Sequence, residues 1–165
     1  MLLTLNELKN YLKITGADED QRLELIRSAA ESEAKRYCKR KFEYGTYIES
    51  TEAVKGVIWV AETPVESVTE VETPEGETLT VYRTNSETGE IILEQNYSGL
   101  LSITYVGGLQ TVPNDLKFAI MRLAEYYYAK TEGVASESIG ELKVNYEAIP
   151  AMAIRALDLY RRVSL

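Results

Sequence analysis

Histidine is absent from the 165 residues of this chain. It is the commonest general base and metal ligand, so its absence disfavours most hydrolase mechanisms. The one cysteine, Cys38, leaves no intramolecular disulfide and favours a reducing compartment. No apolar run approaches the ~18 residues of a membrane span, and Met1 to Leu3 lead into a polar amphipathic segment unlike a signal peptide. We therefore expect an intracellular protein with no enzymatic activity, cofactor, metal or membrane contact.

The remaining residues that could act in catalysis or in ligand binding are weak candidates. Cys38 lies near Lys35, Lys39 and Lys41, whose charges could make its thiol reactive, but without a partner base a half-buried packing cysteine is the favoured interpretation. Four other groups are interpreted as solvated surface, turn or packing positions: Glu31 with Glu33, Glu70 with Glu72, Gly107 with Gly108, and Tyr126 to Tyr128.

The net charge is −8, from 26 acidic and 18 basic residues. An acidic surface repels nucleic acid and anionic membranes, so we expect no tight DNA binding. The alternative is a small DNA-binding module that uses the basic cluster from Lys35 to Lys41. Placement of cations at the negative end of a helix explains this cluster more simply.

Two helices are predicted near the N-terminus. Thr4 and Glu7 form a capping box before a helix from about Leu5 to Leu12. The acidic run from Asp18 to Asp20 then suits the start of a second helix. One apolar stripe runs along this second helix: Leu23, Ile26, Ala30, Ala34 and Tyr37.

The hydrophobic period changes from 3.6 to 2 between about Tyr47 and Tyr105, which predicts β-strands. Turns are expected at 74–77 and 85–89, where glycine is available. The strands are expected at Val57–Val60, Val65–Val71, Leu79–Tyr82, Ile91–Leu93 and Leu101–Tyr105. We therefore predict an α+β fold, a small bundle of about four helices (1–46 and 109–165) with an inserted antiparallel β sandwich or barrel (47–108).

The last third begins with a helix from Pro113 to about Thr131, because proline suits the first helical position. Its core stripe is expected to contain Leu116, Ala119, Ile120, Leu123, Ala124 and Tyr127. A second apolar line, Phe118, Met121 and Tyr128, exceeds what one stripe requires, so either another subunit or the β module covers it. A weakly apolar connection, Glu132 to Tyr146, leads to a final apolar helix, Pro150 to Leu165, which is expected to dock on a partner.

The order of these elements resembles head–tail connector (adaptor) proteins of long-tailed bacteriophages, the gp6-like superfamily. The opening motif is Thr4-Leu5-x-Glu7-x-Lys9-x-x-Leu12, followed by a helix ending Tyr37-Cys38-x-x-Lys41. The β segment is similar to longer members that carry a β module, through Ile103-x-Tyr105-x-Gly107-Gly108 followed by Val112-Pro113. The ending Ser136-x-Ser138-Ile139-Gly140-x-x-x-Val144-x-Tyr146 is similar as well.

The resemblance implies a structural virion protein for head completion after DNA packaging, located at the head–tail interface and in the host cytoplasm during assembly. It would form a homo-oligomeric ring of twelve-fold symmetry, dock under the portal protein, and provide the platform for the stopper or tail-completion protein. We expect Phe118, Met121 and Tyr128 at the subunit interface. Portal contacts are expected from Arg155, Leu159, Tyr160, Arg161 and Arg162. A host-encoded interaction domain or small enzyme with a ligand cleft in the β module remains an alternative.

Overall fold

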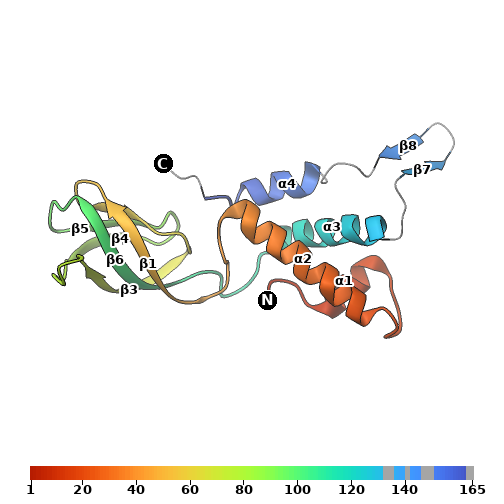
Figure 1. Ribbon diagram of the computed structural model, residues 1–165, viewed down its shortest axis with the longest axis horizontal. Coiled ribbons are helices and arrows are strands. Elements are labelled where there is room, and N and C mark those ends of the chain that lie inside the picture. The colour runs from red at the N-terminus through yellow and green to blue at the C-terminus, as the bar shows by residue number, and fades with distance from the viewer. Residues whose placement is uncertain (132–135, 140–141, 146–150, 163–165) are drawn as a thin grey trace. The chain divides into compact units, whose positions relative to one another are not determined.

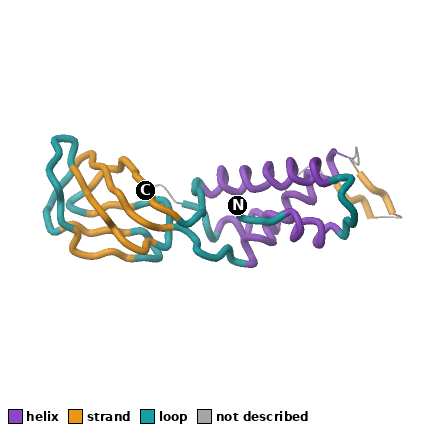
Figure 2. The backbone as a smooth tube through the Cα atoms, turned by 90° about the horizontal axis from the view of Figure 1, so that it is seen from below, coloured by secondary structure: helices purple, strands orange, loops and turns teal. Residues whose placement is uncertain are grey.

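A computed structural model of the chain describes residues 1–131, 136–139, 142–145 and 151–162. The chain divides into two compact units, one comprising Met1–Lys39 with Val112–Leu165 and the other Arg40–Thr111. In the described ranges the first unit holds helices α1 to α4, and the second holds strands β1 to β6 (Figure 2). The predicted α+β class is confirmed. The domain limits at 46/47 and 108/109 remain a prediction.

The helical unit begins as its sequence predicts. Helix α1 (Leu5–Leu12) starts at the capping box, in which Glu7 N donates to Thr4 Oγ1 at 3.2 Å and Thr4 N donates to Glu7 Oε2 at 2.8 Å. Helices α2 (Asp20–Cys38) and α3 (Asn114–Thr131) bury apolar stripes, and each large buried side chain contributes about 1.5 to 3 kcal/mol. The buried stripe residues are Leu23, Ile26, Ala30 and Ala34 on α2, and Leu116, Ala119, Ile120, Leu123 and Ala124 on α3.

Two tyrosines were assigned to these stripes wrongly. Tyr37 and Tyr127 are only half-buried, whereas Cys38 and Tyr126 are buried. A tyrosine at the edge of a core keeps its hydroxyl where it can find a polar partner, and the Tyr37 hydroxyl donates to Asp158 Oδ1 at 2.5 Å.

Among the described helices, none combines the length and the apolar character that a membrane span requires.

The C-terminal segments also differ from the prediction. Helix α4 (Ala151–Asp158) ends well before Leu165, and Tyr160 N donates to Leu157 O at 3.0 Å in the turn that follows. The predicted connection contains a hairpin in which β7 (Ser136–Ile139) pairs antiparallel with β8 (Leu142–Asn145). Short paired strands of this kind lack the long alternation from which strands are recognised in a sequence.

The β unit consists of two three-stranded antiparallel sheets (Figure 1). One has the order β1-β6-β3 and contains β1 (Gly45–Ala53), β6 (Gly99–Gly107) and β3 (Val65–Glu72). The other has the order β2-β5-β4 and contains β2 (Val57–Trp59), β5 (Glu90–Leu93) and β4 (Val81–Asn85). Strand β1 was not predicted, because the carboxylates of Glu49 and Glu52 interrupt its apolar alternation.

One hydrophobic core fills the space between the two sheets. Its buried members are Ala53, Ile58, Val60, Val65, Val71, Leu79, Ile91, Leu93, Leu101, Ile103 and Tyr105. Isolated bridges pair Val54, just after β1, with Val57 of β2, and Glu72 of β3 with Thr78 in the segment that leads to β4. Two antiparallel sheets with one shared core agree with the predicted antiparallel sandwich or barrel.

The predicted turn after β6 depends on two glycines. A Cβ at Gly107 would lie 2.4 Å from Glu62 O. A Cβ at Gly108 would lie 2.1 Å from Glu43 O, and this residue has a φ of +95°. Only glycine allows the backbone to approach so closely to the segment before β1 and to the segment between β2 and β3.

Candidate interaction surfaces

The three residues predicted at a subunit interface have different surroundings on α3. Phe118 is 45% exposed and meets Tyr11 edge-on, with ring centroids 6.1 Å apart. Met121 is half-buried. The Tyr128 hydroxyl donates to Glu19 Oε2 at 3.0 Å. Phe118 is thus the member most available to a partner, while Tyr128 is engaged within its own chain.

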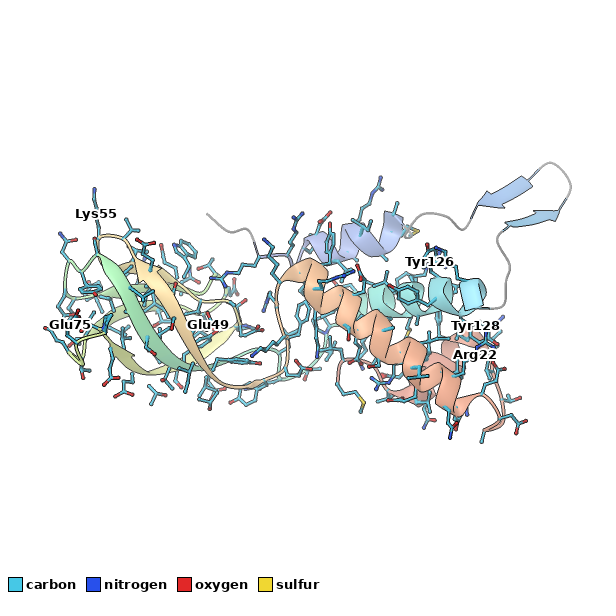
Figure 3. The ribbon with its side chains drawn as sticks, in the orientation of Figure 1. Arg22, Glu49, Lys55, Glu75, Tyr126 and Tyr128 are labelled. Atoms are coloured by element: carbon cyan, nitrogen blue, oxygen red, sulfur yellow. The ribbon has the colours of Figure 1, made fainter. Side chains whose placement is uncertain are left out.

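Figure 3 shows Arg22 and Tyr128 beside one another, and the Arg22 guanidinium lies 4.6 Å from the centre of the Tyr128 ring. Tyr11, whose ring meets Phe118, also makes polar contacts. The Tyr11 hydroxyl donates to Glu125 Oε2 at 3.0 Å, and Arg122 Nη1 donates to the same carboxylate at 2.6 Å. Burial raises the pKa of Tyr11, so this hydroxyl remains protonated and keeps the contact between α1 and α3.

Helix α4 docks on its own unit rather than standing free. Ala153 and Leu157 are buried, and Leu157 O accepts a hydrogen bond from Cys38 Sγ at 3.4 Å. The opposite side of this segment faces solvent, with Arg155 exposed and Leu159 78% exposed. These two predicted portal contacts are therefore accessible on the helical unit.

The other three predicted portal contacts are tied back to the bundle. The Tyr160 hydroxyl donates to Asp115 Oδ1 at 2.7 Å. The Arg161 guanidinium lies 5.3 Å from the centre of the Tyr37 ring, and Arg162 N donates to Cys38 O at 3.0 Å. These contacts hold the end of the described chain against α2 and α3.

The basic cluster from Lys35 to Lys41 is divided between the two units, because the boundary falls after Lys39. Arg36 forms an ion pair with Glu33 on α2. In the β unit, Arg40 donates to Thr63 O and Lys41 Nζ lies 5.4 Å from the centre of the Tyr47 ring. Cys38, between them in sequence, is fully buried rather than half-buried, which agrees with a packing role.

A buried ion pair in the helical unit was missed. Glu31, predicted as solvated surface, is only 7% exposed, and its Oε1 accepts from Arg27 Nη1 at 2.6 Å. The same oxygen accepts from Leu2 N at 3.0 Å and Leu3 N at 2.9 Å. Arginine and glutamate four residues apart were a visible signal, but the third partner is the distant N-terminal backbone.

A second buried polar group lies in the β unit. Glu62 accepts from Lys41 N at 2.7 Å and from Phe42 N at 2.9 Å. Its own N–H donates to the Tyr105 hydroxyl at 3.0 Å, and that hydroxyl donates to Glu49 Oε1 at 2.5 Å. Burial, followed by the bond to Glu49, raises the pKa of Tyr105, so the phenol stays neutral. The group fastens the chain at its entry into the β unit.

Formal charge is distributed unequally between the units. Residues 40–111 contain twelve acidic and four basic residues, a net charge of −8, so the remaining 14 acidic and 14 basic residues of the chain cancel. No three His, Cys, Asp or Glu side chains of the described segments are grouped as metal ligands would be.

The chain is an α+β protein built of a helical unit and a β unit. The model of the head completion protein family matches residues 1–163, so the chain belongs to this family. The predicted connector family and its structural role in joining head and tail are thereby confirmed. No curated protein matches the chain.

Solved structures of gene transfer agent (GTA) particles contain chains with the same fold. In the neck of an empty GTA particle computed with C6 symmetry, the similar chain is 17% identical with a TM-score of 0.65. In the neck of a native GTA particle computed with C12 symmetry, it is 16% identical with a TM-score of 0.65. In the virion of a native GTA particle, it is 19% identical with a TM-score of 0.63. Each match covers 99% of this chain and 91% of the other.

Proposed function

We propose that the protein forms a homo-oligomeric ring of twelve-fold symmetry at the head–tail interface of a virion. The ring docks under the portal protein and provides the platform for the stopper or tail-completion protein. The observation that carries this proposal is the family match over residues 1–163, which includes both units. The shared fold with chains of GTA necks, one computed with C12 symmetry, supports the same location and a ring.

The portal contact is assigned to the C-terminal segment of the helical unit. Leu159 supplies an exposed apolar side chain, and Arg155, Arg161 and Arg162 supply cations for acidic portal groups. Tyr160 positions this segment through its bond to Asp115. An apolar anchor surrounded by arginines is a common composition at the centre of protein interfaces.

Contact between copies is assigned in part to the line Phe118, Met121 and Tyr128 on α3. Phe118 is its exposed anchor, whereas Tyr128 fixes α3 against α2 through Glu19 and Arg22. Phe118→Asp should then weaken association of copies while leaving the helical unit folded, because its side chain is not part of the buried stripe.

Attachment to heads tests the portal assignment. Purified DNA-filled heads that lack this protein are mixed with the full chain, and bound protein is measured after sedimentation. Leu159→Asp with Arg155→Glu should reduce binding at least tenfold. Leu25→Asp, an equally exposed leucine on α2, is the matched control and should bind normally. Equal binding by the double variant would overturn the portal assignment, and no binding by the wild-type chain would overturn the connector role.

We also propose that the protein does not bind DNA tightly, although DNA would pass through its ring. The cluster from Lys35 to Lys41 is divided between units, and the β unit carries the whole net charge of −8. A gel shift with duplex DNA at about 150 mM salt should show no complex. A salt-sensitive complex that Lys39→Gln with Lys41→Gln abolishes would support the DNA-binding alternative instead.

A further inference from the structure

The outer face of the β2-β5-β4 sheet carries an apolar strip, Val57, Trp59 and Ile92, beside the charged pair of Arg83 with Glu90. Val57 lies opposite Ile92, and Ile92 lies opposite Arg83. Ile58 and Ile91 are fully buried and point inward, so their neighbours Val57, Trp59 and Ile92 point outward. In a sheet with one face in water, residues alternate along each strand between apolar ones that point inward and polar ones that point outward. Strand β2 and residues 91–93 of β5 are instead apolar on both sides, which is typical of sheets covered on both faces. We name this surface the Trp59 face.

Aromatic and cationic residues border the Trp59 face. Trp59 is 39% exposed and Tyr82, at the bulge beside Arg83, is 72% exposed. Arg83 Nη2 lies 3.5 Å from Glu90 Oε2, and its side chain remains largely exposed. Lys55, labelled in Figure 3, projects from the turn that precedes β2. Tryptophan, tyrosine and arginine are the residues most enriched among interface anchors.

The outer face of the other sheet carries acidic side chains and no basic ones from its strands. Cross-strand pairing places Ile48, Thr104 and Glu70 in one row, and Ser50, Ser102 and Glu72 in the next. Ile48 is 75% exposed. Strands β1, β3 and β6 contain five glutamates and no lysine or arginine. We name this surface, on which the exposed Ile48 and Leu100 lie among hydroxyl side chains and carboxylates, the Glu70 face.

The two faces lie on opposite sides of one small unit and complement each other. The Trp59 face carries Arg83, which pairs with Glu90, and Lys55 precedes its first strand, whereas the charged side chains of the Glu70 face are all carboxylates. Two Glu70 faces would repel each other, which excludes a symmetric pair through that surface. A contact between two different patches is the heterologous geometry from which a closed ring is built.

We propose that the Trp59 face of one copy packs on the Glu70 face of the next, so that the β units form a continuous belt in the ring. Trp59, Val57 and Ile92 lie against Ile48 and the hydroxyl rows, and Arg83 reaches the carboxylates of the neighbour. This inference rests on the proposed ring and adds a second contact to that of α3. It assigns to the β unit a role in ring closure.

Crosslinking tests the contact in the full chain, assembled on portal-bearing heads. Arg83→Cys and Glu70→Cys are combined in one chain and treated with a short bismaleimide. A heterologous contact gives a ladder of covalent oligomers, and neither single variant gives more than traces. Cys38 is buried, so the wild-type chain serves as the background control. A ring that is visible by microscopy but yields no ladder overturns this inference alone, whereas the absence of any ring overturns the proposed function.

Charge reversal provides the second test. Arg83→Glu alone, and Glu70→Arg with Glu72→Arg alone, should each reduce ring formation at least tenfold. All three changes in one chain should restore it, because each contact then regains opposite charges. Glu75→Arg, on the turn labelled in Figure 3 and outside both faces, is the control and should leave the ring intact. Equal loss in the combined variant, or no loss in either partial variant, would contradict the contact.

Discussion

The two units of this chain satisfy their buried polar groups differently. The helical unit, with equal numbers of acidic and basic residues, buries the ion pair of Arg27 with Glu31. The β unit, with twelve acidic and four basic residues, buries Glu62 against backbone N–H groups and Tyr105. The net charge of −8 is therefore a property of one unit, and arguments from charge about partners apply to the β unit.

The first and largest prediction concerns the helical unit. Arg27→Met should lower the free energy of unfolding by about 3 to 5 kcal/mol, because Glu31 would keep its buried charge without its cation. Urea unfolding followed by the helical signal in circular dichroism measures this loss. Arg36→Met removes an ion pair whose arginine side chain is 77% exposed and should cost at most about 1 kcal/mol. Similar losses in both variants would show that burial does not distinguish the two pairs.

The second prediction concerns the buried hydrogen bonds of Tyr105 in the β unit. Tyr105→Phe should destabilise it by about 1 to 3 kcal/mol, because Glu62 N and Glu49 each lose a buried partner. The pKa of Tyr105 is raised in the folded state, so its contribution is present below the ordinary tyrosine pKa and lost as the pH rises above it. Tyr82→Phe is the exposed control and should be neutral. Tryptophan fluorescence of Trp59 during urea unfolding reports on this unit, and an unchanged midpoint for Tyr105→Phe would contradict the structural role.

Acid should lower the free energy of unfolding of the helical unit, because it protonates Glu7 in α1. Lys117 and the backbone of Thr4 lower the pKa of Glu7 to about 2, so its contribution is present above about pH 4.5 and lost as the pH falls towards 2. Because the side chain is a third exposed, the effect should stay below about 1 kcal/mol. Urea unfolding of wild type and Glu7→Gln should differ at pH 6 and converge towards pH 2. A constant difference across this range would refute the linkage.

The smallest expected effect is a difference between the two units in how their thermal stability responds to salt. Self-repulsion among the excess carboxylates of the β unit is screened as salt increases from about 10 to 150 mM, whereas the neutral helical unit has little repulsion to screen. The thermal midpoint followed by Trp59 fluorescence should rise by about 1 to 3 °C, and that of the helical signal by less. A larger rise for the helical signal would reverse this comparison.

Local sequence signals predicted the elements that depend on local chemistry. The capping box of Thr4 and Glu7, the stripe on α3 after Pro113, and the turns before β4 and β5 all follow from neighbouring residues. The insertion of strands between helices followed from the change of period, and the order of elements led to the correct family.

Contacts between distant residues account for the misses. Glu31 is buried by the backbone of Leu2 and Leu3, which lie 29 and 28 residues away in sequence. Glu49 belongs to a strand because β1 pairs with the distant β6, and its carboxylate accepts from Tyr105, 56 residues later. No local pattern distinguishes these carboxylates from the exposed ones around them. The early end of α4 likewise depends on contacts of Tyr160 and Arg162 with α3 and α2.

A reconstruction of the neck of the particle that encodes this chain tests the central claim most directly. We predict a closed ring of copies between portal and tail, with Leu159 against the portal and Phe118 at a boundary between copies. The Trp59 face of each β unit should meet the Glu70 face of its neighbour. A neck that lacks the chain, or holds it as isolated copies that do not touch, would contradict the connector function.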